Sequence, residues 1–116
     1  LMQILLDRKL AQLGDSFVNL AYSLALTRNL GQPVGTKVSD KILADAARKA
    51  GIRRLLPRRT SRSDVSNAVE SLAAYAWLHH YLTIDEASAV LERQADSPSD
   101  AFATLSERIL KKLLSR

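Results

Sequence analysis

Several kinds of residue are scarce or absent in this sequence, and each absence excludes a class of structure. The 116 residues include no cysteine, so disulfide bonds and thiolate metal sites are excluded. No apolar run approaches the roughly 20 residues that cross a bilayer, and we expect no membrane partner. Apolar and polar residues do not alternate with a period of two, which argues against a β-sheet. Together these absences favour a protein of a reducing compartment, and we expect it in the cytoplasm.

Apolar residues recur instead at the spacing of α-helices, with alanine and leucine the commonest of them. The composition, 47% hydrophobic and 25% charged, is that of an ordinary globular chain of a length that suits one domain. The sequence therefore predicts an all-α fold, a single compact domain of five to six helices over residues 1–116. Tyr75 and Trp77, in the longest apolar stretch, are expected in its core.

Capping residues and helix breakers set the expected ends of these helices. Gly14 permits either a bend or a close approach between helices, and Gly51 suits the position just after a helix. Asp64 is a candidate N-cap, and Thr83 with Glu86 forms a capping box. The expected helices cover residues 1–12, 15–28, 38–50, 64–81, 83–93 and 97–114.

The predicted helix over residues 65–78 is apolar on almost every side and carries a single charge, Glu70. Such a helix is normally buried, and an ionised carboxylate is costly to bury without a partner. Residues 13–27 repeat the pattern, with Asp15 as the only charge. The two carboxylates could converge on one cation, with Asn67 adding an amide oxygen from the same helix face. Glu70 could equally form a buried ion pair with an arginine, and Asp15 could be an ordinary first-turn acid.

Basic residues outnumber acidic ones by 17 to 12, which gives a net charge of +5 and favours a polyanionic partner. Many of them fall in residues 52–63, directly before the helix of Glu70. Arginines suit phosphate oxygens, although a charge run of this kind can also be a solvated loop without a partner. The arginines of this segment are Arg53, Arg54, Arg58, Arg59 and Arg62.

Three segments, taken together, resemble one known family. Residues 13–18, LGDSFV, resemble the LGDAVL segment of the ribonuclease III catalytic domain. Residues 37–44, KVSDKILA, are similar to that family's VSNxxLA helix start, and residues 67–75, NAVESLAAY, to its ADxFEALIGA helix. The order and spacing agree over about residues 13–82. The short length, with no separate double-stranded-RNA-binding domain expected, resembles mini-ribonuclease III and small archaeal relatives.

The resemblance implies a homodimeric all-α endonuclease. It implies Mg²⁺-dependent hydrolysis of double-stranded or structured RNA, for example in ribosomal RNA processing, with Mn²⁺ able to substitute. Asp15 and Glu70 match two of the family's catalytic carboxylates, and they would hold the metal together with Asn67. Ala11 and Asn67 stand where the family has a glutamate and an aspartate. The RNA-binding residues expected from the resemblance are Lys37, Lys41, Arg53, Arg54, Arg58, Arg59 and Arg62.

Three other readings remain open on the sequence. The chief one is a non-catalytic dimeric module of the same fold that binds structured RNA, which the uncharged Ala11 and Asn67 favour. Another is a helix-turn-helix DNA-binding protein that uses residues 38–50, although no second helix follows within a short turn. The last is a purely structural helical interaction domain.

Overall fold

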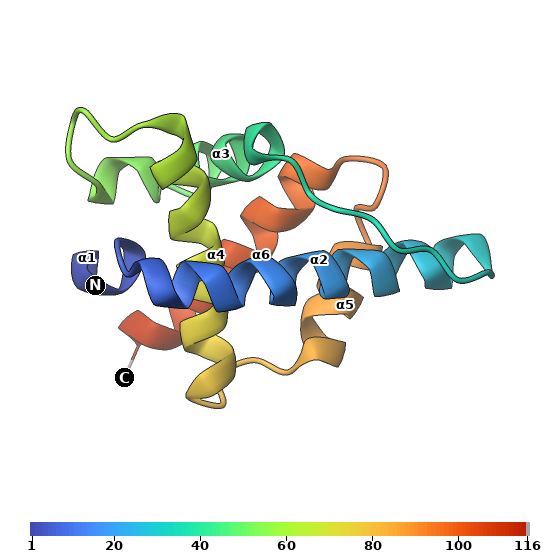
Figure 1. Cartoon of the computed structure of the whole chain (residues 1–116). Helices are drawn as coiled ribbons and strands as arrows, with labels where there is room; N and C mark the ends of the chain where they lie inside the picture. Colours follow the sequence, from blue (N-terminus) through green and yellow to red (C-terminus); the bar gives the residue numbers. More distant parts are fainter. Residues whose placement is uncertain (116) are drawn as a thin grey trace.

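The computed structural model describes residues 1–115 and contains, over that range, six α-helices, one short 3₁₀-helix and no strand (Figure 1). The all-α prediction of five to six helices is therefore confirmed. The helices are α1 (Met2–Leu5), α2 (Arg8–Leu30), α3 (Asp40–Lys49), α4 (Arg62–Leu78), α5 (Ile84–Glu92) and α6 (Pro98–Leu114), with the 3₁₀-helix η1 (Arg53–Leu55) between α3 and α4.

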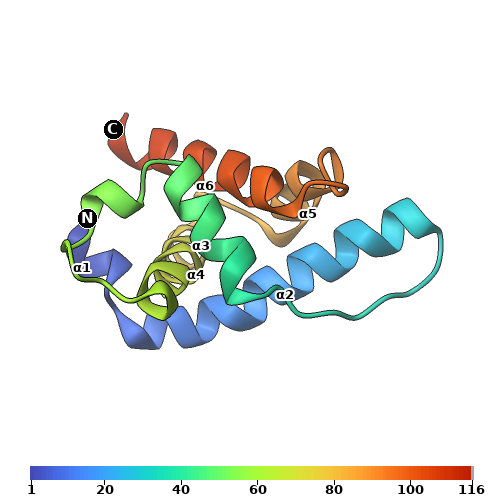
Figure 2. The same cartoon turned by 90° about the horizontal axis from the view of Figure 1, so that it is seen from above.

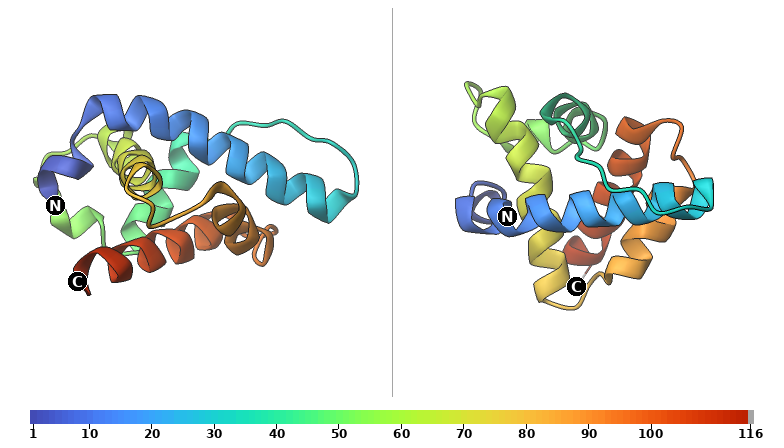
Figure 3. Two further views of the ribbon diagram at one scale, coloured as in Figure 1. Left: turned by 90° about the horizontal axis from the view of Figure 1, so that it is seen from below. Right: turned by 45° about the vertical axis from the view of Figure 1, so that its right-hand side comes forward.

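Helix α4 is the centre of the fold, and the other helices pack around it. It crosses the long helix α2 and also contacts α1, α3 and α6, whereas α5 packs against α2 and α6. Figure 3 shows α4 nearly end-on, with α2 on one side of it and α6 on the other. Because α4 is surrounded in this way, almost all of its residues from Val65 to Ala76 are buried. This explains why its sequence is apolar on every side.

Most of the predicted helix ends agree with the structure to within a few residues, but two do not. The predicted break between residues 12 and 15 does not occur. Helix α2 begins at Arg8, with Asp7 as its N-cap, and continues without interruption through Gly14. Gly14 therefore marks a close approach and not a break. At α4 the predicted N-cap is wrong: Ser61 caps the helix, and its side chain accepts a hydrogen bond from the Asp64 backbone N–H at 3.1 Å.

Three other predicted termini are confirmed. Gly51 follows the C-terminus of α3 in the left-handed conformation, with a φ of 81°. The Thr83 side chain accepts from the Glu86 N–H at 3.0 Å, while the Glu86 carboxylate accepts from the Thr83 N–H at 2.9 Å. Pro98 is the first residue of α6, where its missing N–H costs no helical bond. Local sequence is thus sufficient to set these ends.

The core is one continuous cluster of mainly aliphatic side chains between these helices. The prediction that Trp77 belongs to it is wrong, because 40% of this side chain is exposed and its ring lies over Phe17, with 5.6 Å between the ring centroids. Tyr75 is half-buried against the ring of His79. Within residues 1–115 no helix is both long and apolar enough to cross a membrane.

Candidate functional site

The site is built at the crossing of α2 and α4, where Gly14 lies directly against the backbone of Glu70. A Cβ atom added at Gly14 would stand only 1.9 Å from the Glu70 carbonyl oxygen. The two helices can approach this closely only because glycine has no side chain. Asp15 is the next residue on α2, so the same close approach brings its carboxyl group to that of Glu70.

These two residues face an open cleft of about 600 Å³ at the N-terminal end of α4. One wall is the first part of α2, another is the start of α4, and the first turn of α3 closes the third side. Two uncharged residues singled out in the sequence, Ala11 and Asn67, also line it. The lining residues are Arg8, Ala11, Gln12, Asp15, Asp40, Ser61, Ser63, Asp64, Asn67 and Glu70.

Glu70 is 95% buried, since only 5% of its surface is exposed, and its partner is another carboxyl group rather than an arginine. Burial, a hydrogen bond with Asp15 and the negative charges of Asp15 and Asp40 together raise the pKa of Glu70 to about 8. Among residues 1–115 no ion pair involves Glu70. The alternative of a buried Glu70–arginine pair is thus wrong. With this raised pKa, the Glu70 carboxyl group keeps its proton at neutral pH when no cation is near.

The donor atoms of the cleft suit a hard cation. Asp15, Glu70, Asp40 and the amide of Asn67 offer oxygen atoms, which are the ligands that Mg²⁺ prefers. Over the part of the chain that the structure describes, no three His, Cys, Asp or Glu side chains lie close enough together to hold a metal ion by themselves. A cation here would therefore be held by two carboxylates together with an amide oxygen and water, which is a usual arrangement for Mg²⁺.

A hollow rich in basic side chains lies next to the cleft, on the other side of the first turns of α3 and α4. Three of the seven predicted RNA-binding residues line it: Lys41, Arg53 and Arg62. The two surfaces are adjacent in sequence as well, since Asp40 faces the cleft and Lys41 the hollow. Arg48, which the sequence did not single out, also lines the hollow.

The other predicted RNA-binding residues do not line this hollow. Lys37, Arg54, Arg58 and Arg59 are all exposed, Lys37 before α3 and the arginines between α3 and α4. Arg53 has a local role besides, because its guanidinium group donates to the carbonyl oxygens of Pro57 at 3.1 Å and Arg58 at 2.6 Å. Arg53 thereby holds the basic connector in a folded loop.

Asp40 is the residue of the cleft that sequence reasoning missed. It lies within the KVSDKILA segment, which by its pattern indicates only a helix start, where acidic residues are common. The available signal was its position in a segment that resembles the same family as the segments of Asp15 and Glu70. Arg8, at the start of α2, is a second missed residue of the cleft.

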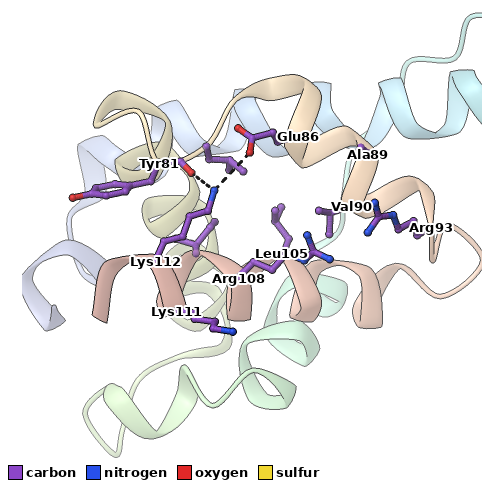
Figure 4. Close-up of a pocket in the computed structure, with 11 residues that line it drawn as sticks. Tyr81, Glu86, Ala89, Val90, Arg93, Leu105, Arg108, Lys111 and Lys112 are labelled. Carbon is purple, nitrogen blue, oxygen red and sulfur yellow. Dashed lines mark hydrogen bonds and ion pairs between the residues drawn. The ribbon is translucent and has the colours of Figure 1, made fainter. Parts of the chain in front are cut away.

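A separate groove of about 510 Å³ lies between α5 and α6, near the opposite end of α4 (Figure 4). Its floor is apolar and its rim is mostly basic. Lys112 extends across it to the carbonyl oxygen of Tyr81 at 2.8 Å and to the Glu86 carboxylate at 3.6 Å. No residue singled out for catalysis or RNA binding lines this groove.

The fold and cleft define a class: an all-helical domain with an acidic, oxygen-lined site where two helices cross, beside a basic surface. A comparison with protein families then matches residues 8–115 to the family described as Ribonuclease III. Because the match covers nearly the whole chain, the chain belongs to the ribonuclease III family. A comparison with curated proteins finds no match. Membership supports a role in cutting or binding RNA.

Proposed function

We propose that this protein is a Mg²⁺-dependent endoribonuclease that hydrolyses phosphodiester bonds of double-stranded or structured RNA, for example in ribosomal RNA processing. The observation that carries the proposal is the convergence of Asp15 and Glu70 at the Gly14 crossing, inside a cleft lined by oxygen donors. Burying the Glu70 carboxyl group beside the acidic side chain of Asp15 is unfavourable in itself. A cation that binds there would relieve this cost.

Asp15 and Glu70 would hold the ion, with the amide oxygen of Asn67 beside them. Bound Mg²⁺ supplies positive charge at the scissile phosphate and lowers the pKa of a water molecule. The side chains of the basic hollow, with the exposed lysine and arginines around it, would contact neighbouring phosphates of an A-form helix, which proteins recognise mainly by shape. The close packing of α2 on α4 would fix the separation of the two carboxyl groups during the reaction.

The direct test is cleavage of a long labelled RNA duplex in Mg²⁺ by the wild type and by Glu70→Gln. We expect the wild type to release short fragments, and we expect the variant to be slower by about 10³-fold or more, because a ligand of the ion is lost. Gel-resolved products over time measure both rates. Cleavage by Glu70→Gln at the wild-type rate would refute the assignment of the site.

A non-catalytic RNA-binding module of the same family is the second candidate, and a specific observation favours it. Two residues that line the cleft, Ala11 on α2 and Asn67 on α4, carry no charge, so these two helices contribute no carboxylate to the cleft at either position. If the protein only binds RNA, neither the wild type nor Glu70→Gln would cut the duplex. Both would still bind it, with an affinity that falls steeply as salt rises, because phosphate contacts dominate such binding.

We also propose that the protein works as a homodimer formed through an apolar patch beside the crossing. Leu13, Leu20 and Trp77 are 37%, 53% and 40% exposed, and Phe17 lies under Trp77 between the two leucines of α2. Exposed apolar residues grouped in this way are typical of an interface, and a two-fold axis would use the same patch on both copies. A dimer would place two clefts on one RNA duplex.

The dimer predicts that Leu20→Glu yields monomers. Two-fold symmetry places the new carboxylate in the interface twice, and burying an unpaired charge costs several kcal/mol. Sedimentation velocity at about 50 μM measures the species present. Leu30→Glu is the matched control, because Leu30 is 61% exposed at the far end of α2 and its replacement should leave the dimer intact. A wild type that sediments only as a monomer at this concentration would overturn the proposed dimer.

A further inference from the structure

The first turn of α3 brings a third carboxylate into the cleft, and this carboxylate is held from across the site. Ser66, fully buried on α4, donates a hydrogen bond from its hydroxyl to Asp40 Oδ1 at 3.0 Å. Asp40 is not needed to cap its own helix, because the Ser39 side chain accepts from the Ile42 N–H. The Asp40 side chain is therefore oriented by the helix that carries Glu70.

A second set of contacts fixes where α3 begins relative to Asp15. Three α2 side chains spaced four residues apart bind the backbone of the extended segment 34–38, which runs back along α2 (Figure 2). We call these three side chains the polar ladder. The pairs are Asn19 with Val38, Ser23 with Thr36 and Thr27 with Val34, with hydrogen bonds between 2.7 and 3.3 Å.

Asn19, one of the three side chains of the polar ladder, also contacts Asp15 of the cleft. The Asn19 amide oxygen accepts from the Val38 N–H at 2.7 Å, and its amide nitrogen donates to Asp15 Oδ1 at 3.3 Å. One side chain thus joins the acid of α2 to the backbone two residues before Asp40. Together with the Ser66 bond, this arrangement orients Asp15 and Asp40 toward a shared cleft.

The number of negative charges in the cleft matters for cation binding. Asn67 lines the cleft on α4 without a charge, so α4 supplies a single carboxylate deep in the site, Glu70. The charge of Asp40 acts on Glu70 across the cleft. A divalent cation is held more tightly when more negative charge surrounds it. Asp40 provides from α3 the charge that Asn67 does not provide from α4.

We propose that Asp40 is the third carboxylate of the cation site, and that it compensates for the uncharged Asn67. The inference rests on the proposed function, because it deepens the same site. Since no three acidic side chains of residues 1–115 are close enough to ligate one ion together, Asp40 acts through water held on the ion, and Mg²⁺ keeps several such waters. It is a positioning residue that strengthens cation binding.

The test measures, by isothermal titration calorimetry and without RNA, how tightly Mn²⁺ and Mg²⁺ bind to variants that each remove one negative charge. Asp40→Asn keeps an oxygen that accepts from Ser66, so it should fold normally while its affinity falls about tenfold. Asp64→Asn is the matched control: Asp64 lines the same cleft, and its removal changes the net charge equally. We expect less than about a threefold loss for it. Far-UV circular dichroism checks that each variant is folded.

A charge swap separates compensation from simple charge removal. Asn67→Asp alone should bind the ions more tightly than the wild type, and Asp40→Asn combined with Asn67→Asp should return to within about threefold of it. Equal losses for Asp40→Asn and Asp64→Asn would overturn the inference and leave the proposed nuclease standing. A wild type that binds neither ion at millimolar concentration, and cuts no RNA duplex, would overturn both.

Discussion

Replacing Gly14 by alanine is expected to abolish the native fold at physiological temperature. The new Cβ would lie 1.9 Å from the Glu70 carbonyl oxygen, 2.4 Å from its carbonyl carbon and 2.9 Å from its Cα. All three atoms are backbone, so no side-chain rotation can relieve the clash. The helices would have to separate by more than 1 Å, which would break packing along the most extensive helix contact of the fold.

The expected loss is about 4 kcal/mol or more, since both overpacking and the separation of α2 from α4 contribute. A domain of this size is stable by only about 5–15 kcal/mol, so the variant should melt at least 15 °C lower or lack a cooperative transition. Thermal unfolding followed by circular dichroism measures the difference. The helix propensity of alanine, about 1 kcal/mol better than that of glycine, works in the opposite direction and cannot offset the clash.

Gly35→Ala is the matched control for this prediction. Gly35 lies in the loop before α3, and a Cβ atom there would have no heavy atom within 4 Å. The same chemical change should therefore alter stability by less than about 1 kcal/mol, in the stabilising direction if the unfolded chain loses freedom. If Gly14→Ala melted as high as Gly35→Ala, the close crossing described here would be wrong.

The comparison of Gly14 with Trp77 shows what the sequence can and cannot predict. A glycine beside a lone aspartate allows two interpretations, a bend or a close approach, and the choice depends on Glu70, which lies 56 residues further along the chain. Similarly, the helix of Trp77 is apolar on every side, so its pattern cannot indicate which face lies outermost. Helix ends depend on neighbouring residues, as the capping box at Thr83 shows, and could be predicted well.

The candidate site could be predicted only where a residue departed from its local pattern. Asp15 and Glu70 stand out because each is the single charge of an apolar stretch, and the structure brings their carboxyl groups together. That they hold a cation stays a prediction. Asp40 follows a Ser N-cap and is unremarkable there. Its role depends on a bond to Ser66, which is 26 residues away, and on the polar ladder. Contacts of this kind are tertiary and leave no periodic signal in the sequence.

Glu70→Gln is expected to be more stable than the wild type at high pH when no metal is present. In the folded wild type the pKa of Glu70 is about 8, above the ordinary value of 4.5, so the folded state binds more protons between these two pH values. Its stability should therefore fall as pH rises from about 5 to about 8 and level off above that. Glutamine cannot ionise, and its amide can donate to Asp15 at every pH, so the variant should lack this decline.

The predicted difference at pH 9 is about 2 kcal/mol, less than the full pKa shift would give, because the cleft is open to solvent. Urea unfolding at pH 5, 7 and 9 measures it. Glu107→Gln is the control, because Glu107 is exposed on α6. The free energy of unfolding of this variant should stay within about 0.5 kcal/mol of that of the wild type at each pH. A wild type with no loss of stability between pH 5 and 9 would contradict the raised pKa of the buried Glu70.

Adding Mg²⁺ should narrow this difference at pH 9, because the cation offsets the repulsion between the ionised carboxylates of Asp15 and Glu70. An ion bound with a Kd of about 1 mM adds about 1.4 kcal/mol at 10 mM, and only the wild type keeps both carboxylates to bind it. The wild type should thus gain stability at pH 9 while Glu70→Gln gains almost none. Equal gains in both proteins would mean that the ion binds elsewhere. The acid that destabilises the metal-free fold is then the same acid that makes the cleft a cation site.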